Sequence, residues 1–106
     1  MPKYLLEGRY TVEGAKGVAK EGGTGRRAAV AKMAEGLGGK LEALYYAFGD
    51  VDVYVILDMP DAATATAAAL AANQSGAVAI KTIVLITPEE VDEAAKKVVT
   101  YRPPGH

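Results

Sequence analysis

Arg26 is the residue of this sequence with the clearest potential for binding chemistry. It follows a glycine-rich break, Gly22-Gly23-Thr24-Gly25, at the start of an expected helix. Backbone N–H groups at a helix start can bind an anion. The phosphate-binding patterns G-x-x-x-x-G-K-[ST] and G-x-G-x-x-G are both absent, so the break also fits a flexible joint whose neighbouring charges are solvated.

The helical pattern aims Arg26 toward the interior. Stepping about 100° per residue, it lies in the middle of an apolar stripe made by Ala29, Val30, Met33 and Leu37. Burying a charge there is costly unless it is paired. Three outcomes stay open: the guanidinium reaches back to water, it pairs with a carboxylate, or it binds an anionic ligand.

Four other polar residues join Arg26 as candidate ligand-binding residues. The expected topology brings Tyr10, Asp52 and Asn73 to the same end of the domain as Arg26, and Tyr54 follows in the same strand as Asp52. We expect these five residues to bind a small anionic molecule. Asp52 has an alternative role in turn chemistry, because Asp side chains commonly bond to nearby backbone groups.

The remaining chemical candidates have plainer interpretations. Tyr45 and Tyr46, like Tyr54, can line a pocket, or they can belong to the core or to a dimer interface. His106 stands in a terminal tail. The acidic residues 89–93 crowd a helix start, where they match the helix dipole. No general acid–base pair is evident, and no catalytic residue is assigned.

Composition excludes several classes of protein. The 12 basic and 13 acidic residues nearly balance, which argues against nucleic-acid binding through a positive field. There is no cysteine and one histidine, so Cys-ligated zinc, disulfides and two-histidine metal motifs are excluded. We therefore expect no metal and no cofactor. No apolar run approaches the roughly 20 residues of a membrane span, so we expect no membrane partner and a cytoplasmic location.

The hydrophobic pattern alternates between strand and helix periods along the chain. It predicts strands at residues 4–10, 41–48, 51–59 and 77–86, and helices at residues 12–21, 24–37, 62–72 and 88–99. The strongest local signal is Thr87-Pro88-Glu89-Glu90, which combines an N-cap threonine, a first-turn proline and a capping-box glutamate.

This order predicts an α+β fold, a ferredoxin-like βαββαβ sandwich with an extra C-terminal helix. Its usual strand order is 4-1-3-2. No linker divides the chain, so residues 1–100 are expected to form a single domain and residues 101–106 a tail.

The face of the sheet away from the helices is too apolar for a monomer. The third strand places Val53, Val55 and Leu57 toward the helices, yet Tyr54 and Ile56 point the other way. Monomers rarely expose apolar patches above a few hundred Å². We expect a second copy to cover this face in a dimeric α+β barrel. The alternative is that the C-terminal helix folds over it.

Motifs spread over nearly the whole chain resemble the GYD domain family of small bacterial and archaeal proteins. They include Glu21-Gly22-Gly23, Gly38-Gly39-Lys40-Leu41-Glu42, Ala71-Ala72-Asn73-Gln74-Ser75-Gly76 and Leu85-Ile86-Thr87-Pro88-Glu89-Glu90. In the signature region, Gly49-Asp50-Val51-Asp52, Gly49 and Asp52 match and Val51 replaces the tyrosine. The resemblance implies a fold similar to dimeric α+β barrel proteins, some of which are cofactor-free enzymes while others only bind ligands.

Three functions follow from these observations. The first is a small ligand-binding or regulatory homo-oligomer whose cleft holds a small anionic molecule. The second is a cofactor-independent enzyme in which Asp52, a tyrosine or Arg26 acts in the pocket. The third is a pure assembly module.

Overall fold

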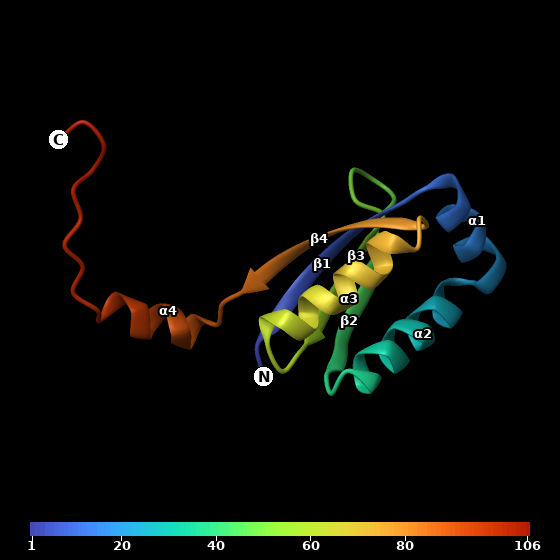
Figure 1. Cartoon of the computed structure of the whole chain (residues 1–106), viewed down its shortest axis with the longest axis horizontal. Helices are drawn as coiled ribbons and strands as arrows, with labels where there is room; N and C mark the ends of the chain where they lie inside the picture. Colours follow the sequence, from blue (N-terminus) through green and yellow to red (C-terminus); the bar gives the residue numbers. More distant parts are fainter.

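The computed structural model describes residues 1–106 as one four-stranded sheet with four helices (Figure 1). Along the chain the elements are β1 (Lys3–Tyr10), α1 (Val12–Glu21), α2 (Gly23–Gly36), β2 (Lys40–Tyr46), β3 (Val53–Asp58), α3 (Ala62–Gln74), β4 (Val78–Leu85) and α4 (Pro88–Ala95). The predicted α+β class is confirmed.

The strands are arranged in the order β2-β3-β1-β4, and every neighbouring pair is antiparallel. This is the predicted order 4-1-3-2, read from the other edge, and it is compatible with a ferredoxin-like sandwich. Helices α2 and α3 lie on one face of the sheet (Figure 1). The opposite face, which we call the open face, has no helix on it.

The core lies between the two central strands and the helices. Leu57 of β3 and the adjacent Met59 are fully buried, and Val53 and Val55 are nearly so. The alternation in this strand therefore predicts its buried side correctly. Alanines of α3 pack closely on the same surface, with Ala65 only 1% exposed.

Side-chain caps begin three of the helices. Thr11 accepts a hydrogen bond from the Gly14 backbone N–H at the start of α1. Asp61 accepts from the hydroxyl and N–H of Thr64 at the start of α3, and these two bonds lower the pKa of its carboxyl. At α4 the predicted capping box is confirmed, with Thr87 and Glu90 bonded reciprocally.

The hairpin between β2 and β3 is wider than expected. The sequence pattern predicts that only Gly49-Asp50 separates the two strands, but β2 ends at Tyr46 and β3 begins at Val53. Within this loop Phe48 adopts a positive φ of 51°, which lies outside the extended conformation of a strand.

A bulge near the start of β2 changes which way one residue points. The register shifts between Leu41 and Ala43, so Leu41 pairs with Leu57 on the helix side. The sequence alternation places Leu41 with Ala43 and Tyr45, which is wrong because the bulge inserts one residue and reverses the pleat.

Helix α4 projects away from the sheet, and all its residues are exposed (Figure 1). The sequence pattern predicts that this helix reaches residue 99, but it ends at Ala95. Short helices without packing partners are marginal, and the β-branched Val98, Val99 and Thr100 disfavour extension. The alternative in which this helix covers the open face of its own chain is contradicted.

Candidate functional site

A cavity of about 410 Å³ lies on the helix side of the sheet. Its walls come from α1 and α2 on one side and α3 on the other, and its floor from all four strands. Of its 23 lining residues 17 are hydrophobic, so the interior favours an apolar occupant.

Small residues on the facing helices create this space. Gly14 and Gly17 of α1 line one wall, and Ala68, Ala71 and Ala72 of α3 line the other. A Cβ added at Gly17 would meet no atom within 4 Å, so there is open space beside this lining residue. Close packing is the norm in protein interiors, so an unfilled apolar cavity of this size is consistent with a binding site.

Arg26 lines the cavity near the start of α2. Its guanidinium Nη1 lies 3.6 Å from Oε2 of Glu21, and its side chain is 36% exposed. Arg26 thus points inward, as the helical pattern predicts, and it also has a carboxylate partner. The ion pair is partly exposed to water. The partner is Glu21, across the break at Gly22, which has a φ of 82°.

Two tyrosines are among the other polar lining residues of the cavity, which also include Glu13, Glu21 and Ser75. Tyr10, the last residue of β1, and Tyr46, the last residue of β2, are both lining residues. The Tyr46 hydroxyl donates to the backbone carbonyl of Gly23 at 3.4 Å, a contact that links β2 to the start of α2. Burial raises the pKa of the Tyr10 phenol to about 12, the neighbouring Tyr46 adds to the rise, and the positive charge of Arg26 opposes it. Tyr10 is therefore neutral at physiological pH and is suited to donate a hydrogen bond.

The five predicted site residues occupy different places. Tyr10 and Arg26 line the cavity together. Asp52 lies next to Tyr10, and its Oδ2 accepts a hydrogen bond from the Tyr10 backbone N–H at 2.8 Å. Asn73 Oδ1 accepts from the Ile80 backbone N–H at 2.7 Å, a bond that joins α3 to β4.

Tyr54 lies on the open face, away from the cavity. It pairs in register with Glu7 and Tyr45, and it is 37% exposed. The structure thus brings Tyr10 and Arg26 together at the cavity, bonds Asp52 to the backbone of Tyr10, and separates Tyr54 from them.

The sequence did not indicate two of the residues that shape the site. Glu21, the partner of Arg26, is the last residue of α1. Because the glycine break interrupts the helical repeat, the sequence pattern does not show that Glu21 and Arg26 lie close together. Gly17 carries a usable signal, because glycines three apart at Gly14 and Gly17 leave a smooth face on α1.

No group of three or more histidine, cysteine, aspartate or glutamate side chains is arranged to hold a metal ion. None of the helices combines the length and the apolar character needed to cross a membrane.

Fold and site together define a small α+β protein with a largely apolar cavity whose polar lining includes Arg26, two tyrosines and the acidic residues Glu13 and Glu21. The chain belongs to the GYD domain family, whose family model matches residues 4–95. No curated protein and no solved structure matches it.

Proposed function

We propose that this protein is a small homo-oligomeric ligand-binding protein whose cavity takes a molecule with an apolar body and one anionic group. The observation that carries the proposal is the cavity itself, about 410 Å³ with Arg26 at its polar end. Small-molecule sites typically enclose about 300–1,000 Å³ and combine apolar walls with a few polar groups.

Arg26 supplies the anion preference. Its planar guanidinium can bind both oxygens of a carboxylate. The existing contact with Glu21 is a single long one at 3.6 Å, which an incoming carboxylate can replace. Tyr10 and Tyr46 offer hydroxyl groups beside it.

A cofactor-independent enzyme is the alternative function, and the site favours binding over it. The Asp52 carboxylate is hydrogen-bonded to the Tyr10 backbone and is not among the lining residues. A tyrosine with a pKa of about 12 is a poor base at neutral pH, because efficient proton transfer needs a pKa near the working pH. A regulatory role is compatible with ligand binding.

The homo-oligomer is supported by the open face. Leu5, Ile56 and Ile83 form an apolar centre on it, with Ile83 40% exposed. A second copy is the partner that we propose for this surface, with no nucleic acid and no membrane involved. The third function, a pure assembly module, would use the open face in the same way but would bind no ligand in the cavity.

Calorimetry with octanoate and the neutral octan-1-ol tests the ligand proposal. We expect octanoate to bind about tenfold more tightly, a difference of about 1.4 kcal/mol. Arg26→Leu should abolish this difference, whereas Arg27→Leu, at an exposed position outside the cavity, should keep it.

A second pair of variants tests whether binding occurs in the cavity. Gly17→Leu fills the space beside α1 and should abolish binding of both compounds. Gly36→Leu is the control, because Gly36 also has open space around it but does not line the cavity. Unchanged binding in Gly17→Leu, or no binding of either compound to the unmodified chain at millimolar concentration, would contradict the proposal.

A further inference from the structure

Three charged side chains line the cavity, and their charges do not cancel. Arg26 carries one positive charge, while Glu13 and Glu21 carry one negative charge each. The other lining residues are uncharged at neutral pH. A ligand whose only charge is negative is therefore attracted by Arg26 and repelled by the two glutamates.

The ion pair of Arg26 and Glu21 leaves both side chains free to bind another group. Its single contact joins Nη1 to Oε2 at 3.6 Å, which is longer than a hydrogen bond. A guanidinium has several N–H donors and a carboxylate has two acceptor oxygens, so this contact uses little of their bonding capacity. The two side chains are 36% and 49% exposed, and a small molecule in the cavity can reach both.

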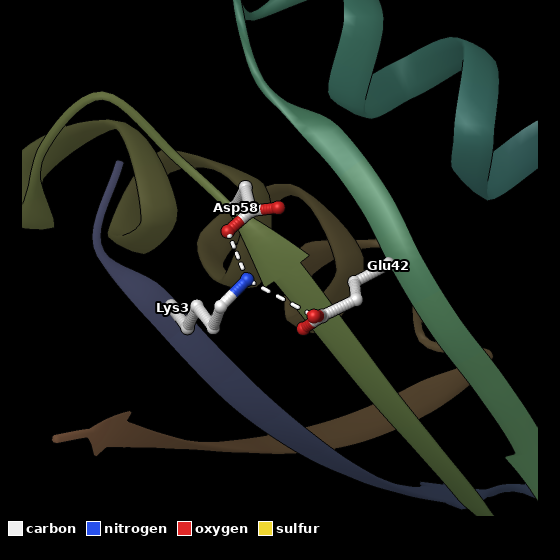
Figure 2. A network of polar contacts seen from close by, with 3 residues as sticks. All are labelled: Lys3, Glu42 and Asp58. Atoms are coloured by element: carbon white, nitrogen blue, oxygen red, sulfur yellow. Dashed lines mark hydrogen bonds and ion pairs between the residues drawn. The ribbon is translucent and has the colours of Figure 1, made fainter. Parts of the chain in front are cut away.

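The charges around Lys3 are satisfied within the chain and provide a contrast. The Lys3 ammonium lies 2.8 Å from Asp58 Oδ1 and 3.0 Å from Glu42 Oε1 (Figure 2). Both distances are in the hydrogen-bond range, so the ammonium and the two carboxylates satisfy one another. Arg26 and Glu21 lie farther apart, and a ligand can supply the groups that complete their bonding.

A simple carboxylate satisfies only one side of this ion pair. When it binds Arg26, it comes close to the Glu21 carboxylate, because Glu21 lies 3.6 Å from the same guanidinium. Two carboxylates at such a distance repel each other. An ammonium group next to the ligand carboxylate would pair with Glu21 and remove this repulsion.

Resting on the proposed ligand-binding function, we propose that the cavity takes an α-amino acid with a large apolar side chain. Its carboxylate binds Arg26, its ammonium binds Glu21, and its side chain occupies the apolar part of the cavity. The amino nitrogen and a carboxylate oxygen of an α-amino acid lie about 2.7 Å apart, and charge-assisted hydrogen bonds are about 2.7–2.9 Å long. With the 3.6 Å contact between Arg26 and Glu21, these distances close a four-sided ring of alternating charges.

This ring requires both charged groups of the ligand on one carbon atom. An alkyl amine would pair with Glu21, but its ammonium would then lie close to the Arg26 guanidinium, a like charge. An amino acid meets both side chains with opposite charges. Three of the four substituents of its α-carbon are held, so one enantiomer should bind more tightly than the other.

Calorimetry with four eight-carbon compounds tests the proposal. The probes are 2-aminooctanoate, 2-hydroxyoctanoate, octanoate and octan-1-amine. We expect one enantiomer of 2-aminooctanoate to bind at least about tenfold more tightly than each of the other three compounds. 2-Hydroxyoctanoate is the matched control, since it keeps the size and the carboxylate but lacks the ammonium charge. Equal affinities of these two compounds, or of the two enantiomers of 2-aminooctanoate, would overturn the proposal.

Glu21→Gln and Glu13→Gln remove the same charge from two places in the cavity. Glu13 lies in the first turn of α1 and Glu21 is its last residue, so they are about 12 Å apart along the helix. Glu21→Gln should weaken binding of 2-aminooctanoate about tenfold and leave octanoate binding equal or tighter. Glu13→Gln should change 2-aminooctanoate binding by less than about twofold, because screening by salt weakens a charge at this distance.

Equal losses in the two variants would mean that only the net charge of the cavity matters, and would overturn the role of Glu21. Both glutamates are exposed, so the variants should fold, and circular dichroism checks this. Octanoate that binds more tightly than octan-1-ol, with no gain from the amino group, overturns the amino acid and leaves the proposed function standing. No binding of any of these compounds at millimolar concentration overturns both.

Discussion

The Oδ2 atom of Asp52 accepts a hydrogen bond from the backbone N–H of Tyr10 at 2.8 Å. The backbone N–H of Asp52 in turn donates to the carbonyl of Gly8 at 2.9 Å. These bonds attach the loop between β2 and β3 to the end of β1, at the point where the Tyr10 side chain enters the cavity. Asp52 therefore holds the frame of the site and is not one of its lining residues.

Replacing Asp52 by alanine should lower the free energy of unfolding by about 1.5 kcal/mol, the low end of the range for a hydrogen bond to a charged group, because the residue is only partly buried. Urea unfolding measures the change. Asp50→Ala is the control, since only the backbone carbonyl of Asp50 is bonded, to Arg9. Equal losses in the two variants would show that the Asp52 carboxylate contributes nothing.

The same measurement tests whether Asp52 and Arg26 act together. The ion-pair partner of Arg26 is Glu21, so the effects of Arg26→Ala and Asp52→Ala should add to within about 0.5 kcal/mol in the double variant. A larger coupling would mean that Arg26 pairs with Asp52 in solution, and Arg26 would then have a structural role.

Alkaline pH should reveal the burial of Tyr10. Its pKa is raised from 10.0 to about 12 in the folded chain, so between these values the unfolded chain loses this proton while the folded chain keeps it. The unfolded state then binds fewer protons, and stability falls as pH rises through this window. Absorbance at 295 nm should show one tyrosine ionising late in the unmodified chain and none at that point in Tyr10→Phe. Identical late steps in both proteins would contradict the assignment.

Two glycines of α1 should respond to alanine in opposite ways. A Cβ at Gly14 would overlap the backbone carbonyl of Ala77, so Gly14→Ala must displace the backbone just before β4 and destabilise the fold by about 1–3 kcal/mol. At Gly17 the space is open, and alanine should stabilise the helix by about 0.5–1 kcal/mol. Thermal melts of the two variants measure this difference, and similar melting temperatures would contradict the close approach of α1 to Ala77, the residue before β4.

The regular parts of the fold could be predicted because each carries a local signal. Alternation in β3 predicts the burial of Val53, Val55 and Leu57, and the residues after Thr87 predict the start of α4. The strand order follows from the sequence of elements. The bulge at Leu41 could not be predicted, since it is set by pairing with β3 and not by a pattern within β2.

The site was harder to predict because it is a cavity between the helices and the sheet, and its volume depends on how these elements pack. Periodicity says which face of α3 is buried, but the separation of α3 from α1 depends on three-dimensional packing. The position of Arg26 on its stripe was visible in the sequence, whereas its contact with Glu21 crosses a break with positive φ at Gly22. Alternation in β3 places Tyr54 on the open face of the sheet. The cavity is on the helix side, so Tyr54 does not reach it.

Weakening the cap of α4 tests whether this helix stands alone. Thr87→Ala removes the side chain that accepts the Glu90 N–H, which should cost the helix about 1 kcal/mol. Because α4 is exposed along its length, the melting temperature should stay within a degree or two of the unmodified chain, while amide chemical shifts of residues 88–95 move toward coil. A large fall in melting temperature would mean that α4 packs on another surface in solution.

Tyr54→Lys tests the proposed interface on the open face. Tyr54 lies beside Glu7 and Tyr45 in the row next to the apolar centre, so a lysine would place a charge where the partner's sheet is expected. The matched control is Leu70→Lys, an exposed apolar position on α3 on the other side of the molecule. Sedimentation equilibrium should show at least a tenfold weaker dimer for Tyr54→Lys, equivalent to about 1.4 kcal/mol, and no change for Leu70→Lys. Equal dimer affinity in the two variants would remove Tyr54 from the interface.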